Sequence, residues 1–286
     1  MPVIVGVPRS GTTLLRMMID AHPDVAIPPE TGFLPALADL DPSADCARTA
    51  CAIITGFETW PDFHLDAAVL HAALEALSPA TAAACARAFY RLYAARHGKP
   101  LWGDKTPSYD TQIDRVVSLL PEARFIHLIR DGRDVMVSVR TLWFRPGATI
   151  EACAADWAHR IARTRAIGAR VPDYLEVRYE ALVLSTEGTL REICRFLDLA
   201  FDPAMLAYHV RSATRLDEHQ ARHDAAGRLV ISKDARLHNQ RFVKEPPRPD
   251  RIGRWKAELS ADEVRRFEAV AGEWLQRLGY GSSESV

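Results

Sequence analysis

The amino-terminal stretch of residues 2–21, PVIVGVPRSGTTLLRMMIDA, limits the possible folds more than any other part of the chain. Residues 3–7 form a short apolar run rich in β-branched side chains, which predicts a buried strand. A tight loop containing PRSGTT follows, and LLRMMIDA then has the apolar spacing that is typical of a helix. The stretch therefore predicts a strand, a glycine-containing loop and a helix in direct succession.

The loop has the composition of an anion-binding turn. Gly6 and Gly11 stand five apart and Thr12 and Thr13 follow, which is the phosphate-loop pattern G-x-x-x-x-G-K-[ST] with threonine in the lysine position. In such a loop successive backbone N–H groups surround anionic oxygens, and the helix amino terminus adds free amides and a positive dipole end. Gly11 allows close backbone approach, and Arg9 places a cation inside the loop. The alternative interpretation is an ordinary strand-to-helix turn with a Ser or Thr cap.

The absence of the lysine restricts the class of ligand that the loop can bind. A nucleoside triphosphate needs that lysine, together with Mg²⁺ held by an acidic residue, to offset its charge. This loop offers Arg9 and hydroxyl groups instead. It fits a ligand with a single 5′-phosphoryl unit and a transferable group of lower charge.

Composition excludes several classes of protein. The chain has 286 residues and is 48% hydrophobic, which is enough for a folded α/β core. Its 36 basic and 37 acidic residues nearly balance, so bulk charge indicates neither a nucleic-acid partner nor a charged membrane surface. Its apolar runs are too short to span a membrane. A strand starting at residue 2 leaves no room for a signal peptide, and five cysteines without a CxxC pair are typical of reduced thiols. We therefore expect a cytoplasmic protein.

Further along the chain, short apolar runs alternate with segments of helical spacing. The runs predict strands at residues 25–27, 101–102, 125–129 and 173–179. Helical spacing recurs at residues 31–40, 110–119, 150–170 and 185–197, and again in the last amphipathic segment. This alternation predicts an α/β fold, a P-loop-type parallel sheet flanked by helices, in a single domain over residues 1–286.

Two segments depart from the alternation. Residues 39–97 are predicted to be irregular over 41–64 and helical over 66–78 and 80–97, so we expect a helical cap inserted into the domain. Residues 213–250 are polar and basic with several prolines, which predicts a long loop near the active site.

Residues whose side chains could bind a ligand or take part in a reaction follow the predicted strands. The glycine-containing loop follows the first strand, and Glu30, Lys105 and Arg130 come after three others. Ligands of parallel α/β sheets bind at the carboxyl ends of the strands. We therefore expect these residues to share one edge of the sheet.

At these residues the chain resembles the sulfotransferases that use 3′-phosphoadenosine 5′-phosphosulfate (PAPS). PRSGTTLL is similar to the 5′-phosphosulfate loop of that family. RDGRDVMVS is similar to its 3′-phosphate motif, an arginine after a strand and a serine eight positions later. The pattern is most similar to the tyrosylprotein-sulfotransferase-like branch and its bacterial small-molecule relatives, and matching segments run from residue 2 to about 280.

The resemblance implies PAPS as co-substrate. It assigns the 5′-phosphate and sulfuryl group to Arg9, Ser10, Gly11, Thr12 and Thr13. It assigns the ribose 3′-phosphate to Arg130 and Ser138, and the planar fork of arginine suits a phosphate. The alternatives are a surface ion pair of Arg130 with Asp131 or Asp134, and a solvated helix face for Ser138.

The resemblance also implies catalytic roles. Glu30 in PPETGF would be the general base for the acceptor hydroxyl, which is favoured if burial raises its pKa toward neutrality. Lys105 in GDKTP would contact the sulfuryl group and the bridging oxygen. The alternative for Glu30 is a glutamate in the first turn of a helix, where the helix dipole favours it. The alternative for Lys105 is a lysine that is solvated or paired with Asp104.

Two further positions complete the implied nucleotide site. Tyr179 in VRYEALV matches a tyrosine near the nucleotide. Lys244 in FVKEP resembles a carboxyl-terminal lysine that closes over the donor, and Arg251 and Arg254 are competing candidates.

The implied reaction is an in-line displacement that requires no metal, because the transferred group carries less charge than a phosphoryl. His219 and His223 are spaced like half of a metal site, but Glu218 precedes the first histidine, so HExxH is absent. His22 is an alternative base, but it lies at a helix end before a proline, which indicates a capping role.

Two rival functions are consistent with the same fold. A P-loop small-molecule kinase would need Asp131 as its Mg²⁺ ligand and ATP as donor. A non-catalytic nucleotide-binding module would retain the loop without turnover. The acceptor and the oligomeric state are not specified by the sequence. Five aromatic residues either indicate an apolar or aromatic-bearing acceptor or are core packing, and core packing is the more common role for those within 39–97: Phe57, Trp60, Phe63, Trp143 and Phe144.

Overall fold

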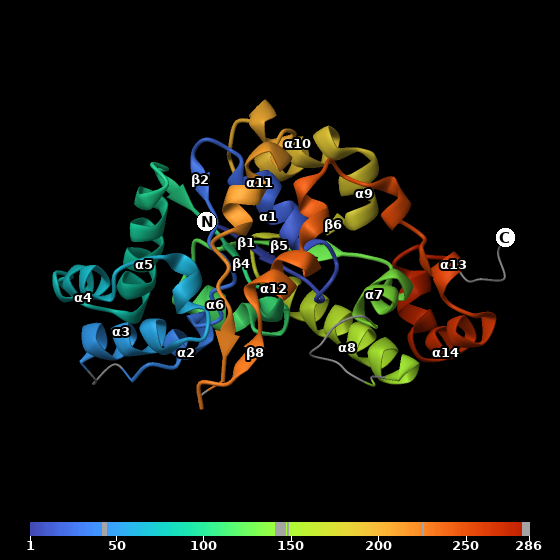
Figure 1. Cartoon of the computed structure of the whole chain (residues 1–286), viewed down its shortest axis with the longest axis horizontal. Helices are drawn as coiled ribbons and strands as arrows, with labels where there is room; N and C mark the ends of the chain where they lie inside the picture. Colours follow the sequence, from blue (N-terminus) through green and yellow to red (C-terminus); the bar gives the residue numbers. More distant parts are fainter. Residues whose placement is uncertain (42–44, 141–146, 148, 225, 282–286) are drawn as a thin grey trace.

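The structure of the chain is a computed structural model that describes residues 1–41, 45–140, 147, 149–224 and 226–281. A four-stranded parallel sheet runs through its middle in the order β4–β1–β5–β6 (Figure 1). The strands are β1 (Pro2–Val5), β4 (Asp104–Lys105), β5 (Arg124–Ile129) and β6 (Tyr174–Arg178). The predicted α/β fold with a parallel sheet is confirmed.

Side-chain alternation along β1 explains why the sheet is covered on both faces. Val3 and Val5 pack in one hydrophobic cluster, whereas Ile4 packs in another on the opposite face. Such period-2 alternation is inherent to a strand, and both faces are apolar here because helices cover both. In register, Ile4 lies between Lys105 of β4 and Ile126 of β5. The carboxyl ends of these strands therefore meet at one edge.

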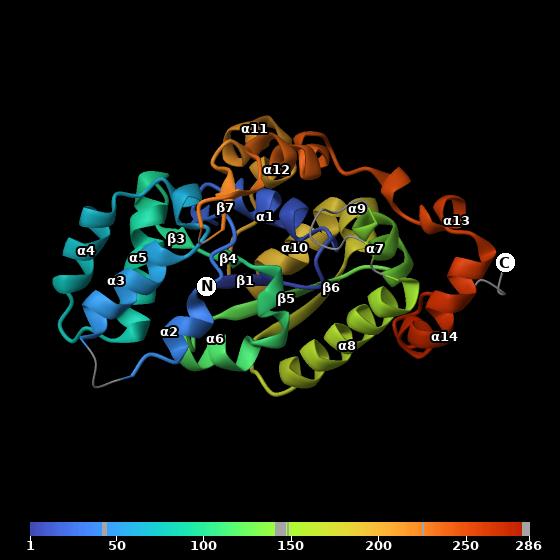
Figure 2. The same cartoon turned by 60° about the horizontal axis from the view of Figure 1, so that its bottom comes forward.

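Helices form a layer on each side of the sheet (Figure 2). The cluster around Ile4 includes α1 (Thr12–Asp20), α9 (Tyr179–Leu184) and α10 (Thr186–Phe196). The opposite face carries α2 (Leu34–Ala38), α6 (Ile113–Leu119) and α8 (Ile150–Gly168). A further cluster joins α8 to α7 (Gly132–Val139) and to α14 (Ala261–Arg277), which begins with a capping box.

The segment 39–97 forms a helical region at one end of the molecule (Figures 1 and 2). Its elements are α3 (Cys46–Gly56), η1 (Trp60–Phe63), α4 (Ala67–Glu75) and α5 (Ala82–Arg96). The helices predicted over 66–78 and 80–97 are confirmed. The irregular structure predicted over 41–64 is wrong, because Asp45 caps α3 and this helix buries Ala50 and Ile54.

Aromatic residues of this region pack with one another. Phe63 is fully buried and meets Phe33 and Phe89 edge to face, and Phe57 also packs against Phe33. Trp60 packs against Phe63. These side chains are therefore core residues rather than acceptor contacts. The other two aromatic residues considered for the acceptor, at positions 143 and 144, lie outside the described residues.

The segment 213–250, predicted as a long loop, contains regular structure. The segment begins within α11 (His209–Leu216) and ends within η5 (Pro249–Arg251). Between them it contains β7 (Arg222–His223), β8 (Leu229–Ile231), α12 (Lys233–Asn239) and η4 (Arg241–Lys244). The prediction failed because long-range ion pairs, which leave no pattern in the sequence, anchor these elements together with a few buried apolar side chains such as Leu216 and Val243. Arg236 makes a bidentate pair with Asp62 at 2.6 and 2.8 Å, and Arg215 makes one with Asp20.

The remaining elements connect these layers. They are β2 (Val25–Ala26), which pairs with β3 (Leu101–Trp102), and three short helices: η2 (Pro107–Thr111), η3 (Pro203–Met205) and α13 (Trp255–Glu258). The chain thus leaves β3 after two residues and joins the central sheet as β4. In the described part of the chain, no helix is both long and apolar enough to cross a bilayer.

Candidate active site

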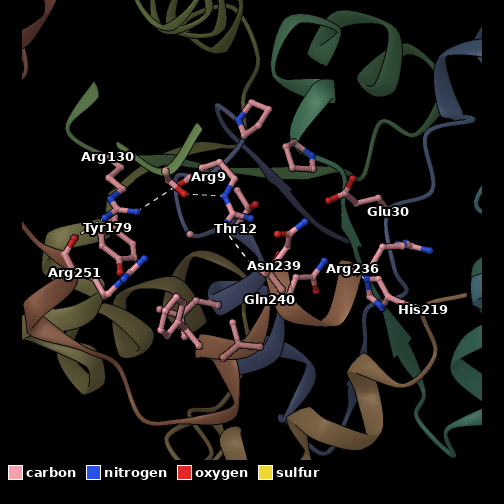
Figure 3. Close-up of a pocket in the computed structure, with 18 of the residues that line it drawn as sticks. Arg9, Thr12, Glu30, Arg130, Tyr179, His219, Arg236, Asn239, Gln240 and Arg251 are labelled. Atoms are coloured by element: carbon pink, nitrogen blue, oxygen red, sulfur yellow. Dashed lines mark hydrogen bonds between the residues drawn. The ribbon is translucent and has the colours of Figure 1, made fainter. Parts of the chain in front are cut away.

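A cavity of about 330 Å³ opens at the carboxyl edge of the sheet. The loop after β1 and the start of α1 form one wall, and Arg130, which follows β5, forms another (Figure 3). Residues 219–251 cover it with side chains from the β7–β8 hairpin, from α12 and from the chain beyond. Glu30 and Arg130 line the same cavity as the glycine-containing loop, so the predicted shared edge is confirmed for these residues. Lys105 lies behind Glu30.

Backbone conformation explains the glycine and arginine of the loop. Gly11 has φ +97°, and a Cβ atom at this position would lie 2.5 Å from the ring of Tyr179. Only glycine fits there. Because glycine has no side chain, the loop can turn into α1 beneath that ring. Arg9 also has a left-handed conformation, with φ +75°, which is uncommon for a residue other than glycine. Strain of this kind is concentrated at functional sites.

Three guanidinium groups gather at one end of the cavity, which we call the donor end and define by Arg9, Arg130, Tyr179 and Arg251. Arg130 donates to the backbone oxygens of Arg9 at 3.2 Å and Arg251 at 2.5 Å, and it stacks on Tyr179 at 4.3 Å. Burial, together with the charges of Arg130 and Arg251, lowers the pKa of Arg9 to about 10. Such a cluster of cations favours an anionic ligand.

Arg9 also links the donor end to more distant segments. Its Nε donates to the hydroxyl of Ser138 at 3.0 Å, and its Nη2 donates to the backbone oxygen of Asn239 at 3.2 Å. Two buried donors nearby, the hydroxyl of Ser10 and Nε of Arg130, have no hydrogen-bond partner within the described structure. Buried polar groups are normally hydrogen-bonded, and because Arg130 lines the cavity, its Nε is a candidate for contact with a ligand.

Neither alternative interpretation of the 3′-phosphate motif agrees with the geometry. Arg130 is only 5% exposed and lies 3.7 Å from Asp134, so it is not a surface ion pair. Asp131 instead caps α7 and pairs with Arg133 at 2.8 Å. Ser138 lines the cavity rather than a solvated helix face.

The opposite end of the cavity carries Glu30, and we call it the acceptor end, defined by Glu30, His219, Arg236 and Gln240. Lys105 Nζ donates to Glu30 Oε1 at 2.6 Å. The Lys105 side chain is only 2% exposed, whereas that of Glu30 is 39% exposed. Lys105 is therefore not solvated, and Glu30 precedes α2 by several residues rather than lying in its first turn.

The protonation of this pair differs from the sequence-based prediction. Burial acts to raise the pKa of Glu30, but the charge and hydrogen bond of Lys105 outweigh it, so the pKa lies below its usual value. The condition that the sequence analysis attached to the role of base, a pKa raised toward neutrality by burial, is therefore not met. Burial lowers the pKa of Lys105, and the charge of Glu30 partly offsets this effect. Glu30 is therefore a carboxylate at neutral pH.

Hydrogen bonds from neighbouring residues hold the pair in place. The carboxylate of Asp104 accepts from the hydroxyls of Thr31 at 2.6 Å and Tyr90 at 2.7 Å. The backbone N–H of Thr31 donates to the hydroxyl of Thr106 at 3.0 Å. Asp104 therefore hydrogen-bonds to the loop that carries Glu30 and is not the ion-pair partner of Lys105.

Comparison with known proteins agrees with this geometry. Residues 3–203 match the family model described as "Sulfotransferase family". The chain belongs to the sulfotransferase family.

Curated relatives of this sulfotransferase-family chain include enzymes that act on protein tyrosine. It is 29% identical to protein-tyrosine sulfotransferase 1 of Danio rerio, over 98% of this chain and 72% of the relative. It is 29% identical to protein-tyrosine sulfotransferase of Drosophila melanogaster, over 98% of this chain and 52% of the relative. It is 26% identical to nodulation protein NoeE of Sinorhizobium fredii, over 98% and 66%. The chain thus spans only about half of the length of the fly relative.

Solved structures of sulfotransferases share the fold. The sulfotransferase domain from the curacin biosynthetic pathway has a TM-score of 0.59 and 20% identity, with 98% of each chain covered. The domain from the Synechococcus olefin synthase has a TM-score of 0.57 and 23% identity, over 95% of this chain and 94% of that one. A mouse sulfotransferase complexed with PAP has a TM-score of 0.52 and 15% identity, over 96% and 83%.

Most of the predicted site residues of this sulfotransferase-family chain line the cavity, with the exceptions given below. The cavity lining includes Arg9, Gly11, Thr12, Thr13, Glu30, Arg130, Ser138 and Tyr179. Ser10 is buried behind the loop, and Lys105 is buried behind Glu30. Among the three competing basic residues, Arg251 lines the cavity, whereas Lys244 and Arg254 do not line it in the described structure.

Sequence reasoning missed the contribution of the segment 213–250. It supplies His219, Arg222, Arg236, Asn239 and Gln240 to the cavity. Their signal was the basic and amide-rich composition of this segment, but no local pattern indicated which side chains turn inward. His223 is exposed, so it does not join His219 in a metal site, and no cluster of three metal-ligating side chains occurs in the residues described. His22 contacts the Ala200 carbonyl at 2.9 Å instead of entering the cavity.

Proposed function

We propose that the protein transfers a sulfuryl group from PAPS to an acceptor hydroxyl by in-line displacement. The observation that carries the proposal is the division of one cavity into a cationic donor end and an acceptor end with a paired carboxylate and ammonium group. A nucleotide with phosphates at its 3′ and 5′ positions requires cations at separate points, and the hydroxyl to be sulfated requires a base beyond the transferred group.

The residues of the donor end fit this co-substrate. Arg130 and Ser138 would hold the 3′-phosphate, and the loop from Arg9 to Thr13 would hold the 5′-phosphosulfate. The partnerless buried Nε of Arg130, a residue that lines the cavity, supports an oxygen-rich ligand at this end. The mouse neighbour complexed with PAP provides further support for a nucleotide of this class.

The chemistry follows from the positions of three charged groups. Glu30 accepts the proton of the acceptor hydroxyl, whose oxygen attacks sulfur while the bond from sulfur to the 5′-phosphate oxygen breaks. Arg9 and Lys105 stabilise the negative charge that develops on the sulfuryl oxygens and on the leaving phosphate. Adenosine 3′,5′-bisphosphate (PAP) then leaves with the bridging oxygen.

The test is donor selectivity. Isothermal titration calorimetry of the protein with PAP in the absence of Mg²⁺ should show saturable binding, and ATP with Mg²⁺ should bind much more weakly. Tighter binding of ATP with Mg²⁺ would favour the kinase instead. The capping role of Asp131 already argues against that rival, because this carboxylate is occupied by Arg133.

Lys105 sets the pH range of the reaction. Because Lys105 lowers the pKa of Glu30, the active carboxylate should persist as the pH falls below about 4.5, the ordinary value for glutamate. In Lys105→Met the effect of burial is opposed only by the more distant charges of Arg222 and Arg236, so the pKa of Glu30 should rise and the acid limb of activity should move to higher pH. A carbon-detected NMR titration of the Glu30 carboxyl in both proteins measures this shift. An unchanged titration would show that Lys105 does not control the base.

Three properties remain part of this proposal. We propose a tyrosine-like or small-molecule hydroxyl as acceptor, supported by the tyrosine sulfotransferases among the relatives. We propose that catalysis needs no metal, because the ion pair and the guanidinium groups supply the positive charge. We also propose a cytoplasmic location without nucleic-acid or membrane partners, supported by the five cysteines, which form no disulfide in the described structure.

A further inference from the structure

Gln240 lies immediately after α12, at a point that joins both ends of the cavity. The preceding residue, Asn239, accepts a hydrogen bond from Arg9 through its backbone oxygen. The side chain of Gln240 contacts His219, which Figure 3 shows beside Arg236 on the side of Glu30. The charge of Arg236 acts on both Glu30 and His219, which places these groups in one electrostatic environment.

The ring of His219 has a defined tautomer. Its Nδ1 lies 3.1 Å from the backbone oxygen of Leu216, and a carbonyl oxygen can only accept a hydrogen bond. Nδ1 therefore carries the proton. Burial, reinforced by the charge of Arg236, holds the pKa of His219 well below 6.5, so the ring is neutral. The other nitrogen, Nε2, consequently presents a lone pair.

This tautomer determines the orientation of the Gln240 amide. Its Nε2 lies 3.3 Å from His219 Nε2, and only the NH₂ group of an amide can donate to a lone pair. The amide oxygen, Oε1, must then face elsewhere. It is buried and has no hydrogen-bond partner in the described structure, although Gln240 lines the cavity. A buried carbonyl of this kind normally has a donor, and because Gln240 lines the cavity, a ligand in the cavity can supply one.

The transferred end of PAPS cannot supply that group, because sulfuryl and phosphate oxygens accept hydrogen bonds. The hydroxyl that is sulfated gives its proton to Glu30. We propose that Gln240 Oε1 accepts a hydrogen bond from a second O–H or N–H group on the acceptor substrate. Gln240 would then be a specificity residue that selects acceptors with a donor group near the sulfated hydroxyl. This inference rests on the proposed function.

The test compares acceptors that differ in one hydrogen-bond donor. Catechol is compared with guaiacol, and N-acetyltyrosine methylamide with N-acetyltyrosine methyl ester, using radiolabelled PAPS. The wild-type protein should prefer the donor-bearing member of at least one pair by roughly tenfold in kcat/KM, the usual effect of one hydrogen bond. In Gln240→Leu this preference should fall to about one. Gln220→Leu, in the same segment but away from the cavity, is the matched control and should keep the preference.

Two measurements separate failure of this inference from failure of the proposed function. PAP affinity, measured by calorimetry, should be equal in the wild type and Gln240→Leu; absence of PAP binding to the wild type would instead refute the proposed function. A long-range ¹H–¹⁵N spectrum should show the His219 proton on Nδ1. A proton on Nε2 would reverse the orientation of the Gln240 amide and overturn the inference. The absence of a preference in both pairs would also overturn it, and this includes the case in which no acceptor of either pair is sulfated.

Discussion

Glu30→Gln is expected to lower kcat by about 10²–10⁴-fold, the usual contribution of a general base. Glutamine keeps the size of the side chain but cannot accept the proton of the acceptor hydroxyl. The affinity for PAP should be unchanged, because Glu30 lies at the acceptor end, away from the nucleotide site that we propose at the donor end. Sulfuryl transfer from radiolabelled PAPS and calorimetry with PAP measure the two quantities.

Glu75→Gln is the control for this substitution. Glu75 is an exposed glutamate at the end of α4, where its partner is His71, and its replacement should leave both quantities within about twofold. A wild-type rate in Glu30→Gln would remove Glu30 from the role of base. Nucleotide binding without turnover in the wild type would favour the non-catalytic module.

Arg130→Met is expected to weaken PAP binding by about a hundredfold, because the variant loses the two charge-assisted hydrogen bonds to the 3′-phosphate that we propose for Arg130. The methionine retains apolar contact with Tyr179 but carries no charge. Asp134, the ion-pair partner of Arg130, keeps hydrogen bonds from the backbone N–H groups of Gly253 at 2.8 Å and Trp255 at 3.0 Å. The fold should therefore persist, and thermal unfolding of the variant verifies this before calorimetry is interpreted.

Lys244→Met provides the comparison within the carboxyl-terminal segment. Lys244 belongs to η4 but is not among the described residues that line the cavity, so its replacement should change PAP affinity less than about threefold. Arg251→Met should have an intermediate effect, since Arg251 lines the donor end. A larger loss in Lys244→Met than in Arg130→Met would restore Lys244 as the residue that closes over the nucleotide.

Local patterns were sufficient for the parts of the site that depend on single strand–helix units. The spacing of Gly6, Gly11 and Thr12 is complete within one such unit, and Arg130 with Ser138 forms a second. The rule that parallel strands present their carboxyl ends together then placed Glu30 and Arg130 in one cavity. These inferences need no knowledge of distant contacts.

Other features depend on contacts between residues far apart in the chain. The segment 213–250 was predicted to be a loop because Arg215 and Arg236 give no sign of partners in sequence. Their partners, Asp20 and Asp62, precede them by 195 and 174 positions. Ion pairs leave no periodic trace of the kind that apolar burial leaves, so pattern reading assigned the whole segment to a loop.

The sequence by itself determined the α/β architecture, the glycine-containing loop between β1 and α1, and the family, because strand alternation, helical spacing and short motifs are local properties. Only the tertiary structure decided that Lys105 lowers the pKa of Glu30 and that the buried amide oxygen of Gln240, a residue of the cavity lining, has no partner in the described structure. The physical reason is that protonation and hydrogen-bond orientation depend on distances of a few ångströms between groups on different elements. Such distances exist only after the chain has folded.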